Sequence, residues 1–220
     1  MRTVIFLLFI SFCFSTCKKD LYDENNRNLG KEYINQNLKF KIIYNVEEIV
    51  FDDFTLSSDT FKYQIMKIND TFFLDNLNEP VLRCETYKRE KDSMKWEFVD
   101  AYFNKLNTNK FEIIENNNRY LKLSFPISDD VYWNSNAFNT ENNSMVHYSK
   151  IKVKETTANY FFPNVIVIKN DPVNNIVRER YFEEKYAEKI GLIYMNKIYI
   201  DKNAGALRGY KIIFNYLKHE

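Results

Sequence analysis

Short runs of aromatic and β-branched residues, separated by clusters of Asn, Asp and Ser, make up most of the chain from Leu38 onward. This pattern is typical of β-strands joined by turns, because such side chains pack well on a pleated surface and Asn tolerates positive φ. In residues 110–115 and 119–125 the apolar positions alternate, which predicts strands with one buried face. Residues 116–118, all Asn, predict a hairpin turn between them. The predicted strands are 38–50, 61–68, 81–90, 95–103, 110–115, 119–125, 145–154, 161–168, 190–200 and 209–217.

The fold class that follows is mainly β: a single antiparallel curved sheet or open barrel with at most one or two short helices, over residues 38–220. Hydrophobic residues make up 45% of the chain and aromatic residues 17%, which is enough to build a core. A β domain of this length commonly forms one unit. The sequence therefore predicts a single β-rich domain.

Residues 176–190 are ambiguous. Their Glu, Lys, Arg and Ala content favours a helix. The apolar residues Val177, Tyr181, Tyr186 and Ile190 also fit a helical stripe. From propensity alone this segment is predicted to be helical.

The first sixteen residues are typical of a bacterial export signal. Arg2 precedes an apolar run, 4–14, which is too short for a spanning helix of about 20 residues. The sequence then changes abruptly at Cys17, and residues 14–17 (Phe-Ser-Thr-Cys) resemble a lipobox, in which small residues precede a cysteine that becomes the lipidated N-terminus. We expect a signal peptide over 1–16 and a palmitate-type lipid anchor on Cys17.

Two other readings of this leader stay open: an uncleaved membrane anchor, and ordinary cleavage without lipid. Cys13 is a poorer lipidation site, because it follows the bulky Phe12 inside the apolar run. Lys18 stands where some bacteria use Asp for inner-membrane retention, which favours the outer membrane, on its periplasmic face or at the cell surface. Residues 17–37 are polar and predict a flexible tether.

The charge of the mature chain excludes one class of partner. The whole chain has a formal net charge of +1, and removal of Arg2 with the leader brings the charge to zero. Nucleic-acid binding requires a basic face, so no nucleic-acid partner is expected. The expected partners are the membrane, through the anchor, and an envelope protein, a glycan or an apolar ligand.

Two further motifs resemble those of small uncharacterised lipoproteins from Bacteroidetes-type bacteria. Residues 130–139 (Asp-Val-Tyr-Trp-Asn-Ser-Asn-Ala-Phe-Asn) are similar to a Trp-Asn-Gly-Asn-Ala-Tyr-Asn segment, with Ser135 in place of Gly. Residues 184–194 are similar to a Tyr-Ala-Lys-Gly-Ile-Gly-Leu-Ile-Tyr hairpin. The resemblance implies a strand before a turn at Gly191, which replaces the helix prediction for the later part of 176–190. It brings no established activity.

The residues that could support catalysis are few. Cys84 lies in a strand-like run, and a catalytic thiol would require a nearby base. The chain has two histidines, His147 in a predicted strand and His219 near the C-terminus, where we expect it to be exposed. No phosphate loop, paired-cysteine metal site or nucleophile elbow is present in the sequence. We expect no enzymatic activity, no cofactor and no metal.

Two weaker motifs could bind or carry a sugar. Asp129 and Asp130 could orient a glycan while Trp133 covers its apolar ring face, although a loop beside a core-anchoring tryptophan explains the same residues. Residues 92–94 (Asp-Ser-Met) resemble an acceptor for O-glycosylation, and whether Ser93 is glycosylated stays open.

The expected function is that of a non-catalytic cell-envelope lipoprotein with a binding or structural role. Three alternatives remain: a carrier of an apolar ligand or lipid in a β cavity, a subunit of a larger envelope assembly, and a hydrolase with an unrecognised site. A continuous apolar cavity would favour the carrier, an exposed aromatic patch the subunit, and convergent polar residues in a cleft the hydrolase.

Overall fold

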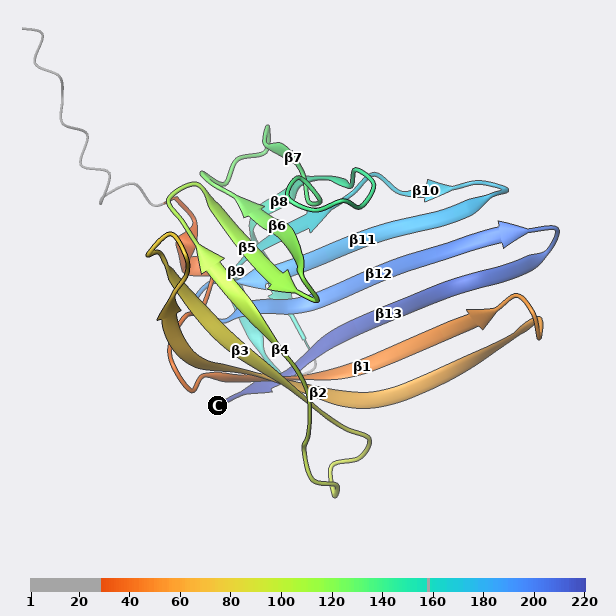
Figure 1. The fold of residues 1–220 in the computed structure, drawn as a ribbon, viewed down its shortest axis with the longest axis horizontal. Coiled ribbons are helices and arrows are strands. Elements are labelled where there is room, and N and C mark those ends of the chain that lie inside the picture. The colour runs from red at the N-terminus through yellow and green to blue at the C-terminus, as the bar shows by residue number, and fades with distance from the viewer. Residues whose placement is uncertain (1–28, 158) are drawn as a thin grey trace, which may run out of the picture.

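One antiparallel sheet accounts for the fold of the part of the chain that the computed structural model describes, residues 29–157 and 159–220 (Figure 1). The sheet has thirteen strands, with neighbours in the order β6-β5-β4-β3-β2-β1-β13-β12-β11-β9-β8-β7 and with β10 paired to β11. The predicted mainly β fold and single antiparallel sheet are confirmed. The strands are β1 (Lys41–Asp52), β2 (Ser57–Leu74), β3 (Pro80–Arg89), β4 (Glu97–Leu106), β5 (Lys110–Glu115), β6 (Asn118–Ser124), β7 (Tyr132–Asn134), β8 (Met145–Thr156), β9 (Phe161–Lys169), β10 (Val173–Asn174), β11 (Arg178–Ala187), β12 (Gly191–Asn203) and β13 (Ala206–His219).

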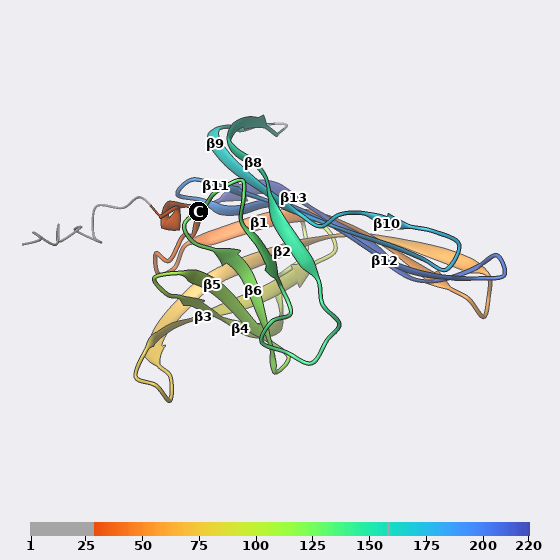
Figure 2. The same cartoon turned by 90° about the horizontal axis from the view of Figure 1, so that it is seen from above.

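The sheet curls until its two ends meet, so that it nearly closes into a barrel (Figure 2). At the meeting point the backbone N–H of Leu121 in β6 donates to the carbonyl of Ser135, just after β7, at 2.8 Å. The indole N–H of Trp133 donates to the Leu121 carbonyl at 3.0 Å. A nearly closed sheet leaves few backbone groups without a partner.

The largest buried cluster lies where the sheet closes. Trp133 packs there against Tyr148, with 4.8 Å between ring centroids. Large apolar side chains inside such a curl supply most of the folding free energy, because they lose their contact with water. The other buried members are Tyr33, Phe111, Leu121, Leu123, Phe125, Val146, Ile166, Ile168 and Tyr186.

The end of the predicted tether is packed rather than free. Residues 31–33 form the 3₁₀ turn η2 (Lys31–Tyr33), and Tyr33 is 2% exposed within the core. The side-chain amide of Asn35 donates to the carbonyl of Lys189 at 2.7 Å, and the Lys189 N–H donates to the Glu32 carbonyl at 2.7 Å. Residues 29–37 therefore belong to the folded part. Cys17, Cys13 and the rest of 1–28 lie outside the described residues.

The helix predicted from propensity for 176–190 is wrong, because this segment forms β11. β11 pairs with β12 on one side and with β9 on the other, so its backbone hydrogen bonds are made within the sheet. Tyr186 is 3% exposed and Ala187 1%. Pairing on both sides outweighs a preference of a few tenths of a kcal/mol per residue, roughly the spread of helix propensity. The strand expected before Gly191 is confirmed.

Gly191 lies at the predicted turn, between β11 and β12, with a φ of 101°. Residues with a Cβ rarely adopt this conformation, and a β-branched side chain least of all. We expect Gly191→Val to lower the free energy of unfolding by about 1–3 kcal/mol, measured by thermal or chemical denaturation. An unchanged melting temperature would contradict this role. The predicted hairpin at 116–118 is also confirmed, because Asn116 and Asn117 take positive φ between β5 and β6.

Parts of six strands, β1, β2, β10, β11, β12 and β13, form an extension of the sheet beyond the barrel (Figure 1). We call this extension the paddle and define it as residues 47–62, 173–183 and 196–213. Three hairpin turns lie at its far end: β1 to β2, β10 to β11, and β12 to β13. The paddle gives the sheet two solvent-facing sides at this end.

Candidate functional site

A charged pair crosses the interior of the barrel. Lys122 on β6 donates to Glu184 Oε1 on β11 at 2.5 Å, and the Tyr186 hydroxyl donates to Glu184 Oε2 at 2.7 Å. Glu184 is 2% exposed. Each carboxylate oxygen therefore has a donor, which a buried carboxylate requires. These contacts tie two walls of the barrel together.

Lys67 on β2 is a second cation in this interior. Its ammonium lies 4.8 Å from the centre of the Tyr102 ring and 6.0 Å from that of Phe214. Burial lowers the pKa of Lys67, since a charged amine loses solvation inside the barrel. The negative faces of the two rings partly replace that solvation. Lys67 thus stabilises packing between β2, β4 and β13.

Cys84 is completely buried on β3, where the sequence predicted a strand. Its Sγ accepts a hydrogen bond from the Asn104 side chain at 3.2 Å and lies 3.5 Å from Asn69 Oδ1. Burial raises the pKa of the thiol to about 12. A nucleophilic cysteine requires a thiolate, so this environment is that of a structural residue.

We expect the Cys84 thiol to resist Ellman's reagent at pH 8 in the folded protein. At a pKa of about 12 only roughly one molecule in ten thousand would carry a thiolate. In a Cys17→Ala variant, the thiol should react fully after unfolding in urea. Fast stoichiometric reaction of the native protein would contradict the buried, inert assignment.

The two histidines lie apart from Cys84 and from each other. The ring of His147 on β8 stacks on Tyr132, with 4.9 Å between centroids. His219 is exposed, as predicted, and lies near the rings of Phe40 and Tyr216. The structure therefore assembles no cysteine–histidine pair from these candidates.

The 130–139 motif closes the barrel instead of forming a sugar platform. Trp133 is 6% exposed and its indole N–H is already bonded, so its ring faces are not free to cover a sugar. The Asn134 side-chain oxygen accepts from the backbone N–H of Asn136 at 3.1 Å and of Ser144 at 2.8 Å, which fixes the loop. Asp129 and Asp130 are exposed ahead of it.

Ser93 is exposed in the loop between β3 and β4, with Met94 N–H donating to the carbonyl of Lys91 at 2.9 Å. An exposed hydroxyl on a turn is accessible to a modifying enzyme. Its glycosylation stays a prediction.

Two open grooves lie on the surface of the described part of the chain. The first, of about 560 Å³, lies at the barrel end beside η2. The second, of about 340 Å³, lies between the β3–β4 loop and the face of the sheet formed by β2, β1 and β13. Neither groove is an apolar cavity of the kind that holds a lipid. The first is lined by Lys31, Glu79, Leu106, Asn107, Thr108 and Asn109.

One face of the paddle exposes aromatic and aliphatic side chains. The strand register sets Asp59, Val50, Tyr210, Tyr199 and Arg180 directly opposite one another across five strands. Directly opposed residues point to the same side of an antiparallel sheet. The Tyr199 and Tyr210 rings stack at 6.0 Å, and the Arg180 guanidinium lies 3.6 Å from the Tyr199 ring centre. We call this side the aromatic face.

The next row of the register adds a second exposed ring to the aromatic face. It sets Phe61 on β2 opposite Glu48 on β1. Phe61 is 48% exposed and Tyr199 45%. Exposed rings on a sheet surface that packs against nothing else are typical of a contact site for another protein.

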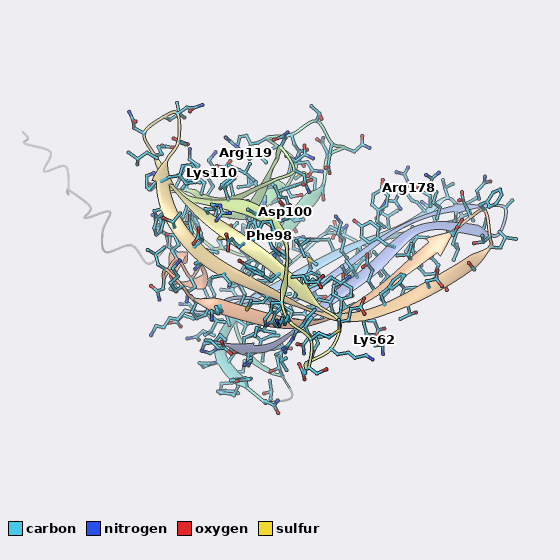
Figure 3. The ribbon with its side chains drawn as sticks, turned by 60° about the horizontal axis from the view of Figure 1, so that its bottom comes forward. Lys62, Phe98, Asp100, Lys110, Arg119 and Arg178 are labelled. Carbon is cyan, nitrogen blue, oxygen red and sulfur yellow. The ribbon has the colours of Figure 1, made fainter. Side chains whose placement is uncertain are left out.

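Charge divides the aromatic face into two sides. Its β1–β2 side carries carboxylates, and its β11–β13 side carries mostly cations, so opposite charges flank the rings. Figure 3 labels Lys62 on β2 and Arg178 on β11, two strands on opposite sides of the paddle. The carboxylates are Glu48, Asp52 and Asp59, and the cations are Arg178, Arg180, Lys197 and Arg208, with Asp201 bound to Arg180 among them.

The sequence alone does not show that these residues lie close together in the fold. Phe61 and Tyr199 are far apart in the chain, and only the register across β2, β1, β13 and β12 brings them to one face. No motif marks them. The turns at the paddle tips also expose Phe54 and Ile176, each at 92%.

The described residues contain no group of three or more His, Cys, Asp or Glu side chains that could hold a metal ion. Within residues 29–157 and 159–220, no helix is both long enough and apolar enough to cross a membrane.

Comparison with known proteins gives similar folds at low sequence identity. No known protein-family model matches the chain, and no curated protein matches it. The structure of a candidate lipoprotein from Parabacteroides distasonis is similar over 86% of this chain and 98% of its own, with a TM-score of 0.47 and 10% identity. A candidate exported protein with a YmcC-like fold from Bacteroides fragilis is similar over 84% of this chain and 98% of its own, with a TM-score of 0.45 and 9% identity.

Proposed function

We propose that this chain is a non-catalytic lipoprotein of the outer membrane, anchored through Cys17, that binds a partner protein with the aromatic face of its paddle. The observation that carries the proposal is the pair of exposed rings, Phe61 and Tyr199, on one face of a sheet extension. Rings between opposite charges provide both contact area and orientation for a protein partner.

The charge pattern defines the partner's surface. It would present cations toward Glu48 and Asp59, and carboxylates toward Arg208 and Lys197, with an apolar strip between them. Complementary charges speed association and select against wrong partners more than they add affinity.

The interior of the barrel favours a binding role over two alternative functions, a carrier of an apolar ligand and a hydrolase. Aromatic and aliphatic side chains fill the core at the barrel closure, and neither of the two grooves is an enclosed apolar cavity, which disfavours the carrier. Lys122 and Glu184 satisfy each other, and Cys84 is buried with a raised pKa, which disfavours the hydrolase.

The first described residue and the tips of the paddle lie at opposite ends of the molecule. The described chain begins at the barrel end, and the hairpin tips lie at the far end (Figure 1). Eleven residues lie between Cys17 and Leu29, so the two can be at most about 40 Å apart. A protein tethered in this way presents its paddle away from its own membrane.

Paired variants test the binding proposal in intact cells. The double variant Phe61→Ser/Tyr199→Ser should abolish an abundant chemically cross-linked species that the wild-type lipoprotein forms with another envelope protein. Phe138→Ser, which changes an exposed ring on a barrel loop, is the matched control and should keep it. Equal cross-linking of the double variant and the wild type at equal abundance would contradict the proposal. Loss of metabolic palmitate labelling in Cys17→Ala tests the anchor separately.

A further inference from the structure

Among the described residues, no strand pairs with one edge of the paddle. β1 pairs with β2 along residues 57–68, whereas β3 pairs with β2 only from Gln64 onward, starting opposite Arg89. No backbone hydrogen bond joins the outer side of 57–63 to any other described residue. This seven-residue edge therefore presents unpaired N–H and C=O groups, which can pair with another strand.

The opposite edge of the paddle is covered by the chain itself. β10 pairs with β11 there, Val173 opposite Arg180 and Asn174 opposite Glu179. The backbone N–H of Asn175 also donates to the carbonyl of Arg178 at 3.0 Å, which closes the turn between β10 and β11. The fold thus protects one edge and leaves 57–63 open.

The β3–β4 loop lies beside the inner end of this open edge. Arg89 holds the loop, because its guanidinium donates to Asp92 Oδ1 at 2.6 Å and lies 4.4 Å from the Trp96 ring centre. A groove of about 340 Å³ lies between this loop and the face of the sheet formed by β2, β1 and β13. The loop is therefore held over this face, next to the open edge.

We propose that residues 57–63 bind an extended segment of a partner protein as an added antiparallel strand. The proposal rests on the proposed function and specifies how the partner is held. Main-chain hydrogen bonds supply affinity in this mode, and alternate side chains supply specificity. The added strand would lie beside the aromatic face, so the same partner contacts both.

Side chains along the edge define the segment. Asp59 faces Val50 on β1 and makes no ion pair among the described residues, so its open side suits a cation. Phe61 is 48% exposed and suits an apolar residue. The Lys62 ammonium forms an ion pair with Glu47 at 3.1 Å on one side. An acidic residue of the partner can pair with it from the other side. Because the added strand is antiparallel, the partner segment runs in the reverse direction. From its N-terminus it would carry an acidic residue opposite Lys62, an apolar residue opposite Phe61, any residue opposite Thr60 and a basic residue opposite Asp59.

A second copy of this chain fits the edge less well. Antiparallel pairing of 57–63 with itself over its full length centres on Thr60. It sets Asp59 opposite Phe61 of the other copy, and Ser58 opposite Lys62. No charge is matched in this register, which favours a different protein as the partner.

A synthetic peptide tests the strand-addition proposal directly. The probe is Val-Glu-Phe-Thr-Arg-Thr-Thr, added to the purified lipoprotein in detergent and followed by hydrogen–deuterium exchange. We expect slower exchange confined to amides within 57–63. Asp59→Lys should weaken binding about fivefold or more, and a peptide with Glu in place of Arg should restore it. The same peptide N-methylated at alternate residues is the matched control and should not bind.

Three results would overturn strand addition: no protection of 57–63 at millimolar peptide, equal binding of the N-methylated peptide, or protection that depends on protein concentration without peptide. The last would indicate a second copy. If the peptide fails while the partner still cross-links to the aromatic face, strand addition is wrong and the proposed function stands. If cross-linking to that face also fails, the proposed function is wrong as well.

Discussion

Gly209→Ala is expected to lower the free energy of unfolding by about 3 kcal/mol or more. Gly209 has a φ of 132°, and a Cβ built there lies 1.9 Å from the carbonyl oxygen of Tyr199. That oxygen belongs to the backbone of the neighbouring strand β12 and cannot rotate away, so the strands must separate or the turn must rearrange. Chemical denaturation of the purified protein measures the loss.

Gly205→Ala is the matched control for this prediction. Gly205 also has positive φ, 90°, but a Cβ there meets nothing within 4 Å. Gly205→Ala should lower the free energy of unfolding by about 1–2 kcal/mol, because only the unfavourable backbone conformation contributes. If the two variants are equally stable, the close approach of β12 and β13 at Gly209 is not tight in solution.

The second large effect is expected at the buried charge pair. Lys122→Met should cost about 3–5 kcal/mol, because it leaves the buried Glu184 carboxylate without its cation. Lys62→Met, which breaks an exposed pair with Glu47, should cost under about 1 kcal/mol. Urea denaturation compares the two variants.

The double variant Lys122→Met/Glu184→Gln separates the charge from the packing. Removing both charges should recover part of the loss, since a neutral amide is less costly to bury than an unpaired carboxylate. A double variant less stable than Lys122→Met would contradict an effect of the lost charge.

Local patterns in the sequence predicted the strands well. Residues 110–115 and 119–125 alternate and form β5 and β6, with Asn116 and Asn117 at the turn between them. Period-two alternation and turn chemistry depend on neighbours in the chain, which a single sequence contains.

The missed features depend on contacts between distant segments. β11 has helical composition, but strands on both sides fix it as a strand. Tyr33 lies in a polar segment, yet its ring is buried in a core built mostly from β5 onward. Lys122 and Glu184 are 62 residues apart and meet only because the sheet curls. The periodicity of apolar residues along the sequence does not show which distant segments come into contact.

The candidate site was the least predictable feature. An exposed aromatic patch favours a subunit of a larger envelope assembly, but no local pattern in the sequence singles out Phe61 or Tyr199. Their common face depends on the order and register of four strands. Trp133, by contrast, was conspicuous in the sequence and is a buried closing residue.

Photo-cross-linking from single positions in living cells tests the central claim, that the aromatic face binds a partner protein. A photoreactive phenylalanine should yield the same cross-linked partner whether it replaces Phe61 or Tyr199. The control position is Tyr132, an exposed ring on β7 of the barrel, where the photoreactive residue should not yield this cross-link. Cross-links at 132 alone, or none at 61 and 199 in a protein of normal abundance and membrane attachment, would contradict the account.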